Sequence, residues 1–186
     1  MNLPTYLTLL RIFVIPLLVI TYYLPFESRY LICAGLFAAA AFTDWLDGFL
    51  ARRWNQTTPF GAFLDPVADK LMVAVALGVL IEAHATWILT FPALIIIGRE
   101  IVISALREWM AEIGKSAQVA VSWLGKVKTT LQMLAIFLLL LVPPGEWQAW
   151  FGVACLYLAA LLTLWSMVIY LQAARPHLLT DEKHPL

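Results

Sequence analysis

Four aspartates between residues 44 and 69 are the side chains of this sequence best suited to chemistry. They are Asp44, Asp47, Asp65 and Asp69, and they belong to a chain that is 62% hydrophobic and only 13% charged. An ionisable side chain within a membrane-embedded chain is costly and therefore indicates a function. Spacings of three and four residues place each pair on one helix face. Carboxylate oxygens in such a group suit hard divalent cations, Mg²⁺ or Mn²⁺.

The two pairs of aspartates are predicted to face each other across a helical hairpin. The segments before Arg52 and after Thr58 are both predicted to be helical, and the link between them is short and polar. A short link makes neighbouring helices antiparallel. At 1.5 Å per residue, the first pair lies roughly 8 to 12 Å from its helix end and the second roughly 10 to 16 Å. The four carboxylates therefore overlap in depth and would repel one another unless cations neutralised them.

Small and cationic residues accompany the aspartates in the same stretch. Gly48, Ala51 and Gly61 lie on the helix faces that carry the carboxylates, where they let a bulky ligand come close. Packing between membrane helices is an alternative role for these small residues, and the two roles are compatible. Arg52 carries a fork of N–H donors suited to phosphate oxygens. The stretch therefore favours a ligand that contains phosphate.

The spacing of these eight positions resembles a known signature. The pattern Asp-x2-Asp-Gly-x2-Ala-Arg-x8-Gly-x3-Asp-x3-Asp, over residues 44–69, is similar at every fixed position to that of the CDP-alcohol phosphotransferase family. Its members are integral membrane enzymes that transfer a phosphatidyl group from a CDP-linked lipid to an alcohol. The resemblance implies a two-metal site that uses Mg²⁺ or Mn²⁺, with Asp69 also acting as the general base. It assigns the metal ligands as Asp44, Asp47, Asp65 and Asp69, and the CDP-binding residues as Gly48, Ala51, Arg52 and Gly61.

Four basic residues mark a second candidate site, for the acceptor. Arg99, Arg107, Lys126 and Lys128 lie at the ends of two predicted spans, and Arg99 lies deep in its span. Arg99 and Arg107 are eight residues apart and share a helix face. Such a cluster suits an acceptor that carries its own phosphate. Anchoring of the cytoplasmic ends is the alternative, with Arg99 paired to Glu100 or to an aspartate.

A softer resemblance extends along most of the chain. The segments 98–108 and 125–133, with 52–56, the opening residues 2–4, Thr8 and Arg11, resemble those of the phosphatidylglycerophosphate synthases of bacteria, a branch of the same family. This resemblance implies that CDP-diacylglycerol is the donor and sn-glycerol 3-phosphate the acceptor. The acceptor hydroxyl would attack the lipid-side phosphorus, giving phosphatidylglycerophosphate and CMP. Dimers are common in the family, so a homodimer is one expected state, and membrane lipids rather than nucleic acid are the expected surroundings.

Two alternatives stay open at the level of the sequence. The first keeps the enzyme class and changes the acceptor to serine, inositol phosphate or phosphatidylglycerol. The second belongs to another class, a divalent-cation channel or carrier built on the four aspartates. Arg52 beside the acidic residues argues against a cation path, because its charge would obstruct the path. A zwitterionic or uncharged acceptor would have little use for Arg99 and Arg107.

The predicted fold that positions these residues is an all-α polytopic membrane protein. A short interfacial amphipathic segment with Leu3, Leu7 and Leu10 precedes the first span. The third helix is predicted to begin near Thr58, or alternatively at Asp65. Residues 1–174 are predicted to form one membrane domain, followed by a polar, loosely ordered tail at 175–186. The six predicted spans cover residues 7 or 12 to 24, 30–50, 58–81, 87–105, 127–142 and 147–171.

Charge distribution predicts the orientation of these spans. Six spans place both termini on one side, and among the twelve Lys and Arg residues only Arg29 falls on the other side. The positive-inside rule makes the side of the termini cytoplasmic. The aspartate site is therefore predicted to open to the cytoplasm, in the cytoplasmic (inner) membrane of a bacterium. Arg11, at the start of the first span, is interpreted as a side chain that extends to the headgroup interface.

Overall fold

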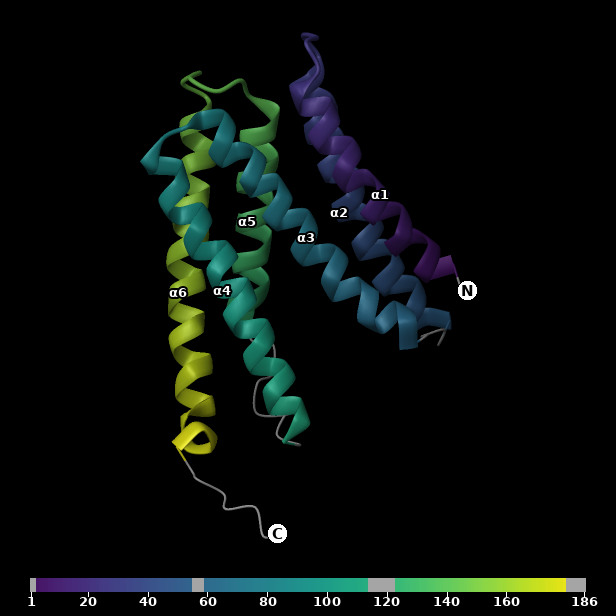
Figure 1. Ribbon diagram of the computed structural model, residues 1–186, viewed down its shortest axis with the longest axis vertical. Coiled ribbons are helices and arrows are strands. Elements are labelled where there is room, and N and C mark those ends of the chain that lie inside the picture. The colour runs from purple at the N-terminus through teal and green to yellow at the C-terminus, as the bar shows by residue number, and fades with distance from the viewer. Residues whose placement is uncertain (1–2, 55–58, 114–122, 180–186) are drawn as a thin grey trace.

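The computed structural model describes residues 3–54, 59–113 and 123–179, and all regular secondary structure in this part of the chain is α-helix (Figure 1). The all-α prediction is therefore confirmed for the described residues. The helices are α1 (Leu3–Tyr23), α2 (Arg29–Trp54), α3 (Pro59–His84), α4 (Trp87–Glu112), α5 (Trp123–Leu141) and α6 (Ala149–Leu179).

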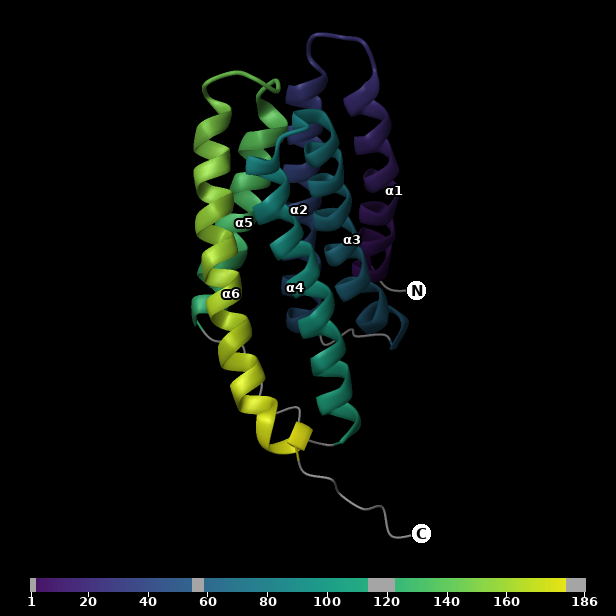
Figure 2. The same cartoon turned by 60° about the vertical axis from the view of Figure 1, so that its left-hand side comes forward.

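Three short turns join the helices in antiparallel pairs. The turns between α1 and α2, α3 and α4, and α5 and α6 lie at one end of the bundle (Figure 2). The first residues of α1 and the last residues of α6 lie toward the other end. The turn before α6 contains Gly145 at a φ of 93°, a left-handed conformation that glycine adopts without steric cost. Prolines at 143 and 144 precede this glycine and prevent α5 from continuing.

Packing between these helices buries an apolar core in the middle of the bundle. Helix α1 packs on α2 and α3, α5 packs on α6 and α2, and α4 packs on α6 and α3. Leu18, Phe37, Leu77 and Ile136 are among the side chains that are fully buried there. Because helix α3 contacts α1, α4 and α5, polar residues on α3 can meet partners from several distant segments of the chain.

The outer surface has the character of a membrane-spanning bundle. Helices α1, α2, α4 and α6 each contain an apolar stretch of 18 residues or more, and α5 contains a shorter one, 127–141. About 20 apolar residues cross a bilayer. Large apolar side chains such as Phe13, Phe91 and Trp165 point outward and are more than half exposed. Lipid contact explains that exposure, and a multi-span membrane protein follows from it.

Several helix boundaries differ from those predicted. The interfacial segment and the first span form a single uninterrupted helix, α1. Helix α3 begins at Pro59 and includes Pro66, so the alternative start at Asp65 is wrong. The first residues of the predicted tail 175–186 continue helix α6 to Leu179 instead of being loosely ordered. The hydrophobic pattern predicts which residues cross the bilayer. Backbone hydrogen bonds can extend the helix beyond those residues.

Candidate active site

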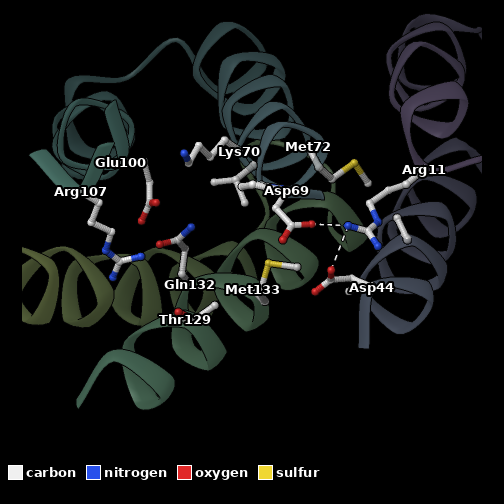
Figure 3. Close-up of a pocket in the computed structure, with 14 residues that line it drawn as sticks. Arg11, Asp44, Asp69, Lys70, Met72, Glu100, Arg107, Thr129, Gln132 and Met133 are labelled. Carbon is white, nitrogen blue, oxygen red and sulfur yellow. Dashed lines mark hydrogen bonds and ion pairs between the residues drawn. The ribbon is translucent and has the colours of Figure 1, made fainter. Parts of the chain in front are cut away.

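Three of the four aspartates converge on an arginine that comes from a third helix. Asp44 and Asp47 lie on α2, and Asp65 and Asp69 lie on α3. Arg11 of α1 places Nη1 2.9 Å from Oδ1 of Asp44 and Nη2 2.6 Å from Oδ2 of Asp47. Nη1 also donates to Oδ1 of Asp69. Figure 3 shows the guanidinium between Asp44 and Asp69. The prediction that the two helices bring their carboxylates together is confirmed for Asp44, Asp47 and Asp69.

Burial within this cluster is uneven. The Arg11 side chain is 2% exposed and that of Asp47 is 4% exposed. Asp44 and Asp69 are 46% and 47% exposed. The interpretation of Arg11 as a side chain that extends to the interface is therefore wrong, because the guanidinium turns inward to three carboxylates.

Thr8 provides a second contact from α1 to the aspartates. Its hydroxyl donates a hydrogen bond to Oδ1 of Asp65, and the residue is buried. Thr8 and Arg11 are three residues apart and therefore share one face of α1. Sequence reasoning did not assign either residue to the site. The sequence did contain a signal for them, because two polar residues at helical spacing within an otherwise apolar helix indicate a polar contact on that face.

The donor chemistry of the cluster fits a hard divalent cation. Its four acidic side chains present only oxygen ligands, which Mg²⁺ and Mn²⁺ prefer. One guanidinium, that of Arg11, contacts three of these carboxylates, so the acidic groups of the cluster outnumber its cation. Among the residues that the structure describes, no three acidic, histidine or cysteine side chains lie close enough together to hold a metal ion. Arg11 instead lies between the carboxylates.

The predicted CDP-binding residues are described only in part. Gly48 is half-buried on α2 and Gly61 is buried on α3, in the same two helices as the aspartates. Ala51 and Arg52 belong to α2, but their side chains lie outside the described part of the structure. The role of all four residues in binding CDP stays a prediction.

A cavity connects the aspartates with the predicted acceptor residues. Its volume is about 280 Å³. Arg11, Asp44 and Asp69 line one side, and Glu100 and Arg107 lie on the other (Figure 3). The residues between them come from α3 and α5 and are mostly apolar or neutral. These are Pro66, Met72, Val73, Thr129, Gln132 and Met133, with Lys70 as a further cation.

Glu100 holds two of the four predicted acceptor residues. Its Oε1 accepts hydrogen bonds from Nζ of Lys128 at 2.6 Å and from Nη1 of Arg99 at 3.2 Å. Lys128 and Arg99 are buried, and Nη2 of Arg99 also donates to the Ser166 hydroxyl. This is the pairing of Arg99 with Glu100 that the anchoring alternative expects. The two cations and Glu100 form one network across α4, α5 and α6.

Arg107 differs from these two cations because it is exposed and lines the cavity. Its Nη2 donates to the hydroxyl of Tyr170 at 3.1 Å. The guanidinium carbon also lies 5.3 Å from the centre of the Tyr170 ring. The Lys126 side chain lies outside the described part of the structure. Among the described members of the predicted set, Arg107 is therefore the one that the cavity reaches.

Sequence reasoning did not assign Lys70 or Gln132 to the cavity, and it named Glu100 only as a possible partner of Arg99. Lys70 follows Asp69 on α3 and donates to the hydroxyl of Ser104 on α4. Glu100 joins the basic residues as described above. Gln132 is buried, and its Oε1 has no hydrogen-bond partner within the described part of the chain. Adjacency in sequence, Lys70 to Asp69 and Glu100 to Arg99, was the available signal.

Comparison with known proteins gives matches over nearly the whole chain. The family model described as CDP-alcohol phosphatidyltransferase matches residues 1–169. A protein of Pectobacterium atrosepticum is 62% identical over 178 residues, covering 96% of this chain and 97% of the relative. One of Sodalis glossinidius is 61% identical over 175 residues, covering 94% and 96%. Both relatives are named CDP-diacylglycerol–glycerol-3-phosphate 3-phosphatidyltransferase.

Proposed function

The chain belongs to the CDP-alcohol phosphatidyltransferase family, and we propose that it is an enzyme that transfers the phosphatidyl group of CDP-diacylglycerol to sn-glycerol 3-phosphate. The products are phosphatidylglycerophosphate and CMP. The names of relatives that are 61% and 62% identical along almost their full length support this reaction. One structural observation carries the proposal. A single cavity has carboxylates at one side and a cationic side chain, Arg107, at the other.

The aspartate cluster is the proposed metal site. Asp44, Asp47, Asp65 and Asp69 would hold Mg²⁺ or Mn²⁺, and a two-metal site suits their number. When bound, the metal neutralises the negative charge of the pyrophosphate and of the departing CMP. Oxygen-only ligands, and acidic groups that outnumber the cation, support this assignment, as described above.

Asp69 is proposed as the general base. Its side chain is 47% exposed and lines the cavity, so an acceptor hydroxyl can reach it. Asp47, by contrast, is buried against Arg11. Asp69 takes the proton as the hydroxyl oxygen forms a bond to the lipid-side phosphorus. The bond from that phosphorus to the bridging oxygen then breaks, and CMP leaves with the electron pair.

Donor and acceptor are proposed to bind at opposite sides of the cavity. Gly48, Ala51, Arg52 and Gly61 would bind the CDP group, as the family signature implies. The phosphate of the acceptor would lie on the basic side, with Arg107 as its most accessible donor. Arg99, Lys126 and Lys128 are further proposed contacts, of which Arg99 and Lys128 share Glu100 as counter-ion. A planar guanidinium can bind phosphate through two parallel hydrogen bonds.

The proposed location is the cytoplasmic membrane of a bacterium, with both termini and the active site on the cytoplasmic side. The start of α1 and the end of α6 lie toward the same end of the bundle (Figure 2), which supports a common side for the termini. Arg29 begins α2 at the opposite end. A homodimer stays a prediction. An ion channel is disfavoured because relatives that are 61% and 62% identical to this chain are named as phosphatidyltransferases.

A headgroup assay on the purified full-length protein tests this function. The protein in detergent receives CDP-diacylglycerol and Mg²⁺ with glycerol 3-phosphate, serine, inositol phosphate or phosphatidylglycerol, and CMP release is measured. We expect release with glycerol 3-phosphate and none after Asp69→Asn. Release with another acceptor would keep the enzyme class and reject the acceptor. If folded protein releases no CMP with any acceptor, metal flux through vesicles becomes the next measurement.

A further inference from the structure

Arg11 is a buried cation at the centre of the site, although the family signature begins only at residue 44. It is the largest of the side chains that are almost fully buried in α1. Its two terminal nitrogens contact three of the four aspartates. Its Nε is buried without a hydrogen-bond partner in the described part of the chain. The side chain is therefore held chiefly by its contacts with the carboxylates.

A charge at this depth requires a reason. Moving an arginine into an apolar span is costly unless it is paired, and closely spaced carboxylates repel one another unless a cation lies between them. The guanidinium satisfies both requirements at once, because Nη1 and Nη2 connect Asp47 and Asp44 of α2 with Asp69 of α3. Thr8, on the same face of α1, bonds the fourth carboxylate, Asp65.

We propose that Arg11 is the built-in counter-cation of the aspartate cluster: it holds the carboxylates together in the metal-free protein and competes with divalent ions for the same oxygens. The inference rests on the proposed function, which assigns metal to these aspartates. Because the guanidinium already contacts these carboxylate oxygens, a divalent ion gains them only by displacing it.

Two consequences follow for a variant without this charge. In the metal-free state, Arg11→Gln leaves Asp44, Asp47 and Asp69 without their cation and lowers the temperature of unfolding. With metal, the variant has lost a competitor, so the ion binds more tightly than in the wild type. A residue with a purely structural role would give the first effect and not the second. Lower stability without metal, together with tighter metal binding, would therefore identify Arg11 as a counter-cation.

The test uses full-length protein in detergent, without substrate, and Mg²⁺ or Mn²⁺ alone as the ligand. Thermal unfolding is followed against Mg²⁺ concentration, and Mn²⁺ binding is measured from the free-ion resonance signal. We expect the half-saturating concentration to fall roughly ten-fold in Arg11→Gln, a change of about 1.4 kcal/mol. Arg99→Gln is the matched control, because Arg99 is also buried, at 8% exposed, but pairs with Glu100. Its metal affinity should equal that of the wild type.

Two further variants keep the proposal testable if Arg11→Gln does not fold. Arg11→Lys keeps the charge but not the two-pronged contact, so its metal affinity should lie above that of the wild type. Adding Asp47→Asn to Arg11→Gln removes one negative charge and should restore part of the metal-free stability. Metal affinity that is unchanged or weaker in the Arg11 variants would overturn the role of Arg11 alone. Absence of any metal effect, in wild type and variants alike, would overturn the metal site as well.

Discussion

We expect Arg107→Gln to separate recognition of the proposed acceptor from the rest of the reaction. Arg107 is exposed, lines the cavity, and contacts Tyr170 through a 3.1 Å hydrogen bond and its aromatic ring. Neither contact involves an acidic partner, so removing the charge leaves no carboxylate unpaired there. Glutamine keeps a polar side chain of moderate length. The variant should therefore fold, with a stability loss of about 1 kcal/mol from the lost tyrosine contacts.

The expected loss in acceptor binding is larger than this. A hydrogen bond to a charged group contributes about 1.5 to 3 kcal/mol. Because Arg107 is exposed, water screens its charge and the lower end of that range applies. About 1.5 kcal/mol corresponds to roughly a ten-fold change in binding. We expect the KM for glycerol 3-phosphate to rise by about that factor, with the KM for CDP-diacylglycerol unchanged.

Initial rates of CMP release measure this effect, with glycerol 3-phosphate and with glycerol, which has no phosphate. The ratio of kcat/KM for the two acceptors should fall roughly ten-fold in Arg107→Gln. A folding defect would lower both values equally and leave the ratio unchanged. Arg53→Gln is the matched control, because Arg53 is an exposed arginine near an aromatic ring, that of Phe49. An acceptor ratio in Arg107→Gln equal to that of this control would refute the reasoning.

Three other predictions concern the aspartates and the helix packing. Asp69→Asn should abolish CMP release while the protein still binds CDP-diacylglycerol, whereas Asp47→Asn should weaken lipid binding and raise the Mg²⁺ requirement; equal losses of lipid binding would argue against a separate base. Thr8→Val removes the hydroxyl that donates to an aspartate and should lower kcat about ten-fold, and Thr8→Ser should retain most activity. Gly152→Ala would place a Cβ 2.6 Å from Cγ of Leu139, and it should lower the unfolding free energy by about 1 to 3 kcal/mol in denaturation experiments.

The aspartate hairpin is the part of the site that could be predicted from local sequence. Residues 44–69 contain both pairs of carboxylates and the short link between their helices. A helix fixes which side chains share a face, and a short link fixes the direction of the next helix. Both rules act over a few residues. The proximity of Asp44 and Asp47 to Asp69 could therefore be predicted from local sequence, and the structure confirms it.

The partners of charged side chains were harder to predict. Arg11 lies more than 30 residues before Asp44, so its distance from the aspartates depends on how α1 packs against α2 and α3. Near the start of a span, the local sequence does not show whether an arginine side chain points to the membrane interface or into the bundle. The buried pairing of Lys128 with Glu100 likewise joins α5 to α4. Hydrophobic pattern carries no information about such pairs.

The sequence by itself determined the all-helical membrane class, the signature at residues 44–69 and the family to which it points. These depend on composition, helical period and short spacings, which are local properties of the chain. Only the tertiary structure decided that Arg11 and Thr8 complete the aspartate site and that Arg107 shares a cavity with Asp69. Which side chains meet across different helices depends on how the whole bundle packs. A buried charge without a partner is costly, so this packing favours arrangements in which charges from different helices pair.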